Sequence, residues 1–155
     1  MNMIAAVRIR GISGVSRDKQ LTFNLLRMFN KNYCVVVQNT KNYIGMLNKL
    51  KDYITWGEIN EETLLLLIKE RGRLAGNKQI THEYLKEKNI DLEIFVKEIF
   101  INKKSLKDIP GFKQFFRLKP PLNGFERGGI KKPYSLGGAL GYRKDKINDL
   151  IRRMI

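Results

Sequence analysis

The sequence predicts an α+β protein in which two helices cover one face of a small sheet and a helical, glycine-rich basic extension follows. Apolar residues alternate with a period of two directly after the N-terminus, which indicates a strand. Segments with helical periodicity then alternate with short β-branched runs as far as residue 58. The region after Pro110 follows neither period and is rich in glycine and basic residues.

The first strand is predicted at the start of the chain. Its apolar residues share one face: Met3, Ala5, Val7 and Ile9. Arg8 and Arg10 fall on the opposite face, which we expect to be basic and free of helices. Two glycines, Gly11 and Gly14, then end the strand, and Ser16 can cap a following helix.

The rest of residues 1–58 alternates between helix and strand. A helix is predicted through Asn30, with an apolar stripe of Leu21, Leu25, Met28 and Phe29. The β-branched run at 33–37 predicts a buried strand, and 53–58 predicts another. Between them, a helix is predicted over 41–51 with a cap at Thr40. Two helices on one face of this sheet make an α+β sandwich, and we expect a domain of residues 1–58.

Residues 59–155 form the second predicted unit, a helical segment followed by the basic glycine-rich extension. Helices are expected at 61–71, 82–88 and 91–100, where the last has apolar residues at i, i+3, i+4, i+7 and i+8. A short strand ending at prolines is expected near residue 117, and a final helix at 145–155. We expect the helices of 59–100 to face solvent or another protein, although they could pack onto the first unit.

The charge of the chain is large and unevenly distributed. Thirty Lys and Arg against fifteen Asp and Glu give a formal net charge of +15. Residues 1–58 carry +6, residues 59–100 carry −1 and residues 101–155 carry +10. A polyanion would relieve the self-repulsion of such a surface, and nucleic acid is the usual polyanionic partner, with an anionic membrane surface next. Two basic segments around a neutral one predict a composite basic face.

The sequence gives little support to membrane, secreted or enzymatic classes. No apolar run approaches the roughly 18 residues of a membrane span, the N-terminus lacks a signal-peptide pattern, and one cysteine allows no disulfide framework. We therefore expect a cytoplasmic protein without a small-molecule substrate. Cys34 lies in a predicted buried strand and His82 in a polar helix start, so we expect a core thiol and a surface imidazole. Neither has a catalytic partner nearby, and no metal or cofactor motif is present.

Two glycine-rich stretches invite comparison with phosphate loops. The turn from Gly11 to Gly14 lacks the lysine of a P-loop, and it follows a strand, whereas the GXXG clamp of a KH domain joins two helices. The segment FERGGIKKPYSLGGALGYR, residues 125–143, combines five glycines with bases and aromatic residues. It fits either a glycine-rich hairpin with solvated lysines or an RNA contact that follows the backbone and stacks on bases.

Several motifs together resemble the family of large-subunit ribosomal proteins numbered thirty in archaea and bacteria, whose eukaryotic counterpart is large-subunit protein seven. They are the R-I-R-G sequence at 8–11, N-T-x-x-x-x-G-M-L-N-K at 39–49, W-G-E at 56–58 and the glycine-rich basic segment. The resemblance covers essentially the whole chain and is closest to the long archaeal form. It implies a ferredoxin-like first unit of three antiparallel strands and two helices. It also implies binding to large-subunit ribosomal RNA, ribosomal proteins as neighbours and no reaction.

Nine basic residues are predicted to contact RNA, mainly at phosphate and sugar. They are Arg8, Arg10, Arg17, Lys19, Arg127, Lys131, Lys132, Arg143 and Lys144.

Two other classes of protein remain open from the sequence: a free-standing regulator that binds RNA or DNA, and an RNA-processing enzyme, which would need a cluster of acids or a histidine site. We expect the glycines at 128, 129, 137, 138 and 141 to serve either tight turns or a close approach to phosphate.

Overall fold

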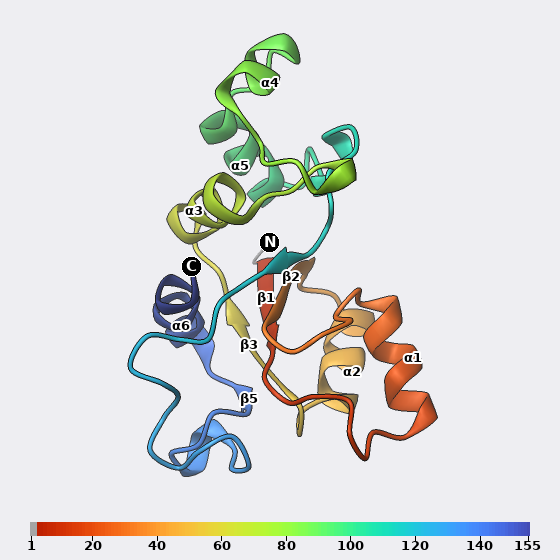
Figure 1. The fold of residues 1–155 in the computed structure, drawn as a ribbon, viewed down its shortest axis with the longest axis vertical. Helices are drawn as coiled ribbons and strands as arrows, with labels where there is room; N and C mark the ends of the chain where they lie inside the picture. The colour runs from red at the N-terminus through yellow and green to blue at the C-terminus, as the bar shows by residue number, and fades with distance from the viewer. Residues whose placement is uncertain (1–2) are drawn as a thin grey trace.

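One five-stranded sheet runs through the middle of the protein (Figure 1). The computed structural model describes residues 3–155, apart from the side chain of His82. The central strand β1 (Met3–Arg8) pairs antiparallel with β2 (Tyr33–Gln38) on one side and with β3 (Ile54–Glu58) on the other. This confirms the α+β class and the three strands predicted from periodicity.

Two short strands widen the sheet beyond the three strands of residues 1–58. β4 (Phe116–Arg117) pairs antiparallel with β2, at the place where the sequence indicated a strand ended by prolines. β5 (Gly141–Tyr142) pairs parallel with β3 and lies inside the glycine-rich segment. A strand of two residues shows no periodicity, so sequence patterns cannot reveal β5.

Helices α1 (Arg17–Leu25) and α2 (Lys41–Lys49) cover one face of the sheet. The core beneath them contains Phe23, Leu47 and Leu50, which pack on the β-strand side chains of Ile4 and Trp56. The Thr40 side chain accepts a hydrogen bond from the amide of Tyr43, so the predicted cap of α2 is confirmed.

The apolar stripe predicted for α1 is wrong in three of its four positions. Leu21, Leu25 and Phe29 are 55%, 75% and 45% exposed, whereas only Met28 is buried. The helix ends at Leu25, and the left-handed backbone of Arg27, with φ of 59°, turns the chain before Met28. Helical spacing therefore does not extend to the last two residues of the predicted stripe.

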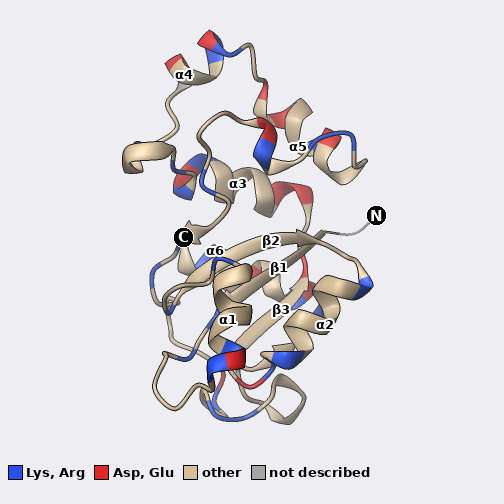
Figure 2. Ribbon diagram, turned by 90° about the vertical axis from the view of Figure 1, so that its right-hand side faces the viewer, with Lys and Arg blue, Asp and Glu red and all other residues tan. Residues whose placement is uncertain are grey.

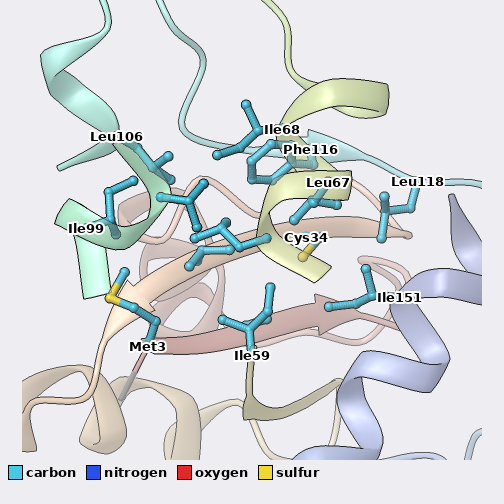
Figure 3. Close-up of a cluster of buried hydrophobic side chains, with 14 of the residues drawn as sticks. Met3, Cys34, Ile59, Leu67, Ile68, Ile99, Leu106, Phe116, Leu118 and Ile151 are labelled. Atoms are coloured by element: carbon cyan, nitrogen blue, oxygen red, sulfur yellow. The ribbon is translucent and has the colours of Figure 1, made fainter. Parts of the chain in front are cut away.

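The opposite face of the sheet is also covered. Helices α3 (Glu61–Arg71), α5 (Leu92–Phe100) and α6 (Ile147–Met154) contribute to a second core against this face, which includes Met3, Cys34, Leu67, Ile99 and Ile151 (Figure 3). The short helix α4 (His82–Glu87) lies farther from the sheet, at the tip of the molecule in Figure 1. Layers of helices therefore enclose the sheet on both sides.

This second layer overturns one expectation, because helices cover both faces of the sheet, whereas one face was expected to be basic and free of helices. It also decides between the two arrangements considered for the helices of 59–100: α3 packs onto the first unit and buries Leu64, Leu67 and Ile68. The predicted face of Met3, Ala5 and Val7 does exist, but it meets the second layer and not α1 and α2. Alternation along β1 revealed which residues share a face, but gave no information on what would cover it.

The two predicted units share one sheet and one core. β4 and β5 belong to the second segment, yet they pair with strands of the first, and the core of the second face draws residues from both. Residue 58 therefore marks the end of a topological unit within a continuous structure. Independent folding of residues 1–58 stays a prediction.

Cys34 is a core residue, as predicted. Its side chain is fully buried, and burial raises the pKa of the thiol far above its ordinary value. Within residues 3–155, no helix combines the length and apolar character needed to cross a bilayer.

A fragment of residues 1–58 tests how far the first unit depends on the second layer. Without α3 and α6, the face formed by Met3, Ala5 and Val7 becomes exposed. We therefore expect the fragment to bind the dye 8-anilinonaphthalene-1-sulfonate strongly and to unfold at a lower urea concentration than the full chain. Equal midpoints and no dye binding would show that the first unit is self-sufficient.

Candidate nucleic-acid interface

Arg8 is buried within the protein and does not reach an RNA surface. It is 2% exposed, and its guanidinium lies over the ring of Phe23 at 3.9 Å. Its Nη1 donates to the backbone carbonyls of Met28 at 2.7 Å and Phe29 at 3.1 Å, while Nε donates to that of Arg10. Burial lowers the pKa of Arg8, but an arginine keeps its charge in such a site. We therefore correct the prediction for Arg8, which holds the turn after α1.

Arg143 is also buried and internally paired. It is 2% exposed, and its guanidinium forms two hydrogen bonds with the carboxylate of Glu126, the shorter of 2.7 Å. It also donates to the hydroxyl of Thr55 at 2.7 Å and to the carbonyl of Ala139 at 2.8 Å, and it lies 4.8 Å from the centre of the Tyr134 ring. These contacts fasten the glycine-rich segment to β3, so the prediction of an RNA contact at Arg143 is corrected as well.

The glycine-rich segment is folded back on itself. The amide of Gly128 donates to the carbonyl of Gly137 at 2.9 Å, and that of Leu140 donates to Lys132 at 3.2 Å. Leu140 and Ala139 are buried against Ile9, which follows β1. The segment is therefore neither a hairpin of ordinary strands nor a free linker, but a compact loop docked at one end of the sheet.

The glycines of this loop fall into two groups. Three have φ near 80°, as Gly137 does with φ of 79°, and allow the chain to turn; the other two are Gly129 and Gly141. Gly138 instead permits close packing, since a Cβ there would lie 2.0 Å from the carbonyl oxygen of Lys132. Gly128 is similarly pressed against Gly137. The space that the glycines clear is therefore filled by the loop's own backbone.

Tyr142 adds a further tie between this loop and the sheet. Its hydroxyl donates to the carboxylate of Glu58, and this hydrogen bond, more than burial, raises the pKa of Tyr142 to about 12. The phenol therefore stays protonated and keeps donating at neutral pH.

The folded loop leaves several predicted cations facing solvent. Arg127, Lys131, Lys132 and Lys144 are exposed, and none of the four forms an ion pair with any described residue. Because their backbone is fixed by the loop, their charges are held at defined positions while their side chains remain available.

The start of α1 contributes the remaining predicted cations. Arg17 is exposed and is the first residue of the helix. Arg10 and Lys19 are half-buried around Tyr53, with their cationic groups 5.2 and 5.1 Å from the ring centre. Lys19 also lies 4.0 Å from the carboxylate of Asp52. Arg17 is thus a free cation, whereas Arg10 and Lys19 are partly held by the protein.

These segments gather at one end of the molecule, which we call the basic end. It comprises the start of α1, the glycine-rich loop and Lys144, which directly follows the loop, and its exposed members are Arg17, Arg127, Lys131, Lys132 and Lys144. Figure 2 shows basic residues at the start of α1, at the end of α2 and in the loop below the sheet, whereas acidic residues are prominent on α3 to α5 at the opposite end. Of the nine predicted residues, five are exposed, Arg10 and Lys19 are half-buried, and Arg8 and Arg143 are buried.

Sequence reasoning missed two cations beside this end. Lys49 and Lys51 are exposed where α2 finishes. A lysine at the end of a helix is favourable without any ligand, because it interacts with the helix dipole. The sequence therefore gave no reason to assign these lysines to RNA binding.

Comparison with known proteins identifies the family. Residues 4–54 match the family described as ribosomal protein L30p/L7e. The chain is 48% identical to large ribosomal subunit protein uL30 of Methanopyrus kandleri, over 95% of this chain and all of that protein. The chain belongs to the uL30 family. The uL30 proteins of Methanococcus vannielii and Nanoarchaeum equitans are 49% and 48% identical and cover 97% and 100% of this chain.

Membership of the uL30 family confirms the resemblance drawn from the motifs, including its extent. The match to uL30 proteins of archaea covers the glycine-rich loop and α6 as well as the first unit. The family fold is ferredoxin-like, in agreement with the sheet and the α1–α2 layer described above.

Replacing Arg143 by alanine separates its structural role from binding. The change leaves Glu126 with only the more distant Arg153, at 3.8 Å, and removes the donor to the Thr55 hydroxyl and the Ala139 carbonyl. Each buried polar group left unsatisfied costs about 1–3 kcal/mol of unfolding free energy. We expect a clear fall in the urea midpoint, monitored by circular dichroism. The control is Lys131→Ala, which removes an exposed charge of the same loop and is expected to leave the midpoint unchanged. Equal midpoints for the two variants would contradict a structural role for Arg143.

Proposed function

We propose that this protein binds large-subunit ribosomal RNA through its basic end, as a structural component of the large ribosomal subunit in the cytoplasm. The observation that carries the proposal is the group of exposed cations without ion pairs on the rigid loop of residues 125–143 and at the start of α1. Membership of the uL30 family supplies the class of RNA.

The chemistry of the basic end favours phosphate as the main target. Lysine and arginine side chains that are exposed and unpaired can replace the counterions of an RNA backbone, and such contacts depend on the shape of the RNA more than on its sequence. The amides at the start of α1 add partial positive charge beside Arg17. Two contact regions from distant parts of the sequence can hold neighbouring RNA segments together and so stabilise a junction during assembly.

The opposite end of the molecule suits a different role. Its helices α3 to α5 carry acidic and basic residues in near balance, as the net charge of −1 for residues 59–100 indicates. A surface of this kind gains little from a polyanion. We propose that it faces solvent or a neighbouring ribosomal protein.

No catalytic role is proposed. The regulator considered from the sequence gains no support from the relatives, which are named as ribosomal proteins. Sedimentation of the tagged protein in a lysate gradient separates the two, because a ribosomal component should move with large subunits and be released by ribonuclease.

Removing two charges from the loop tests the basic end. We expect Lys131→Ala with Lys132→Ala to weaken binding to archaeal large-subunit ribosomal RNA and to reduce the slope of log affinity against log salt by about 1–2, since each phosphate contact contributes about 0.7–0.9. Binding can be measured by filter retention over a range of potassium chloride concentrations. A slope near zero for the unaltered protein would contradict the RNA proposal itself.

The matched control removes the same charge from the other end. Lys86 and Lys88 are exposed lysines in and just after α4, remote from the basic end. Their replacement by alanine should leave the salt slope close to that of the unaltered protein. Equal losses from both pairs would mean that total charge, and not its location, determines binding.

A further inference from the structure

A second set of side chains, outside the residues that define the basic end, combines aromatic rings with a cation. Phe29, Tyr33, Phe115 and Arg117 meet where β4 borders the sheet, and we call them the aromatic platform. The Tyr33 and Phe115 rings stack with centres 5.2 Å apart, and Phe29 stands edge-on at 5.8 Å from Phe115. The Arg117 guanidinium lies 5.8 Å from the Tyr33 ring and 6.0 Å from the Phe115 ring.

The fold holds the platform in place from two directions. Pairing of β2 with β4 sets Tyr33 directly opposite Arg117, and the amide of Leu118 donates to the carbonyl of Asn32 at 3.1 Å. The buried guanidinium of Arg8 holds the carbonyl of Phe29 at 3.1 Å. A pre-ordered aromatic surface loses little conformational freedom when it binds a ligand.

The platform keeps accessible surface. Phe29 is 45% exposed and Arg117 is exposed, although Tyr33 is buried. A single exposed phenylalanine is common on protein surfaces and does not by itself indicate a site. What distinguishes Phe29 is that it packs edge-on against Tyr33 and Phe115, the same two rings over which Arg117 lies.

All charged residues in the two chain segments that form the platform are basic. The segments 27–33 and 113–119, which β2 and β4 bring together, contain five basic residues and no acidic residue. The five are Arg27, Lys31, Lys113, Arg117 and Lys119. None of them forms an ion pair within the described part of the chain.

We infer that the aromatic platform binds an unpaired RNA nucleotide, whose base stacks on Phe29 while Arg117 and its neighbouring cations contact the adjoining phosphates. Every base has a π-face, so this contact would accept any base but requires it to be unpaired. An anionic, aromatic ligand matches both halves of the surface, whereas a protein partner would need several acidic side chains to neutralise the five cations. This inference rests on the proposed function and adds a second binding mode to it.

The platform lies beyond the end of α1, whose first residue, Arg17, belongs to the basic end. The Arg8 guanidinium links the two regions, because it donates to the carbonyls of both Phe29 and Arg10. An RNA strand bound by the cations of the basic end can therefore present an unstacked base to the platform.

The test uses the full chain and an eight-residue oligouridylate with 2-aminopurine at its centre, because the fluorescence of 2-aminopurine falls when it stacks. We expect the unaltered protein and Phe29→Trp to quench the probe. Phe29→Leu keeps an apolar side chain but removes the flat ring, so it should abolish the quenching and weaken binding roughly fivefold or more. Its salt slope should not change, because no charge is lost. Arg117→Ala should reduce both the affinity and the slope, the latter by about one.

Two controls isolate the platform. Tyr43→Leu alters a similarly exposed aromatic residue, on α2 and outside the platform, and should leave quenching unchanged. A duplex in which 2-aminopurine is base-paired should show no difference between the unaltered protein and Phe29→Leu. Urea midpoints of the Phe29 variants confirm that each is folded at the temperature of the assay.

The outcomes distinguish this inference from the function on which it rests. If Phe29→Leu still quenches and binds normally while the Lys131 and Lys132 variant binds weakly, the platform has no RNA role and the proposed function stands. If Phe29→Leu binds RNA normally but no longer joins reconstituted large subunits, the platform contacts a protein, and the inference is overturned. If neither set of changes affects RNA binding, the proposed function fails too.

Discussion

The burial of β1 on both faces is the constraint on which the rest of this structure depends. A central strand with helices on each side needs apolar side chains toward both, and β1 supplies Ile4 and Ala6 to one core and Met3, Ala5 and Val7 to the other. Three of the chain's helices exist in their present positions because the second of these faces must be covered. The long C-terminal region therefore covers an apolar face of the sheet as well as supplying positive charge.

Arginine has two separate roles in the protein. Arg8 and Arg143 are buried and connect segments distant in sequence, since Arg8 donates to the carbonyl of Met28 and Arg143 donates to the hydroxyl of Thr55. Arg17 and Arg127 carry the same charge but remain in solvent. The guanidinium can serve both purposes because it offers five donors in a fixed plane and stays charged when buried. Net charge alone therefore overstates the charge available to a partner.

Periodicity predicted most helices and strands, because each is a run of residues that buries one regularly spaced apolar face. The helix at 92–100 is an example, since Phe95, Val96 and Ile99 are buried as their spacing requires. Prediction failed where a left-handed residue ended a pattern, as Arg27 does after α1, or where a two-residue strand lay within the glycine-rich loop, as β5 does. At the candidate site, Lys131 and Lys132 are exposed as expected, but Arg8 and Arg143 are not. Whether an arginine is buried depends on its tertiary partners, and the carbonyls that receive Arg8 come from residues twenty positions away. The aromatic platform was missed for the same reason, because strand pairing brings its two segments together.

The position of α6 in the chain has a consequence for the order in which the protein can fold. Its residues 147–154 complete the core against β3, a strand that ends at Glu58. At a synthesis rate of roughly 5–20 residues per second, β3 precedes α6 by about 4–18 seconds. During that interval the apolar face of the sheet has no permanent cover, so the final closure must follow completion of the chain. A newly made molecule is therefore most vulnerable to aggregation just before its last two turns of helix dock.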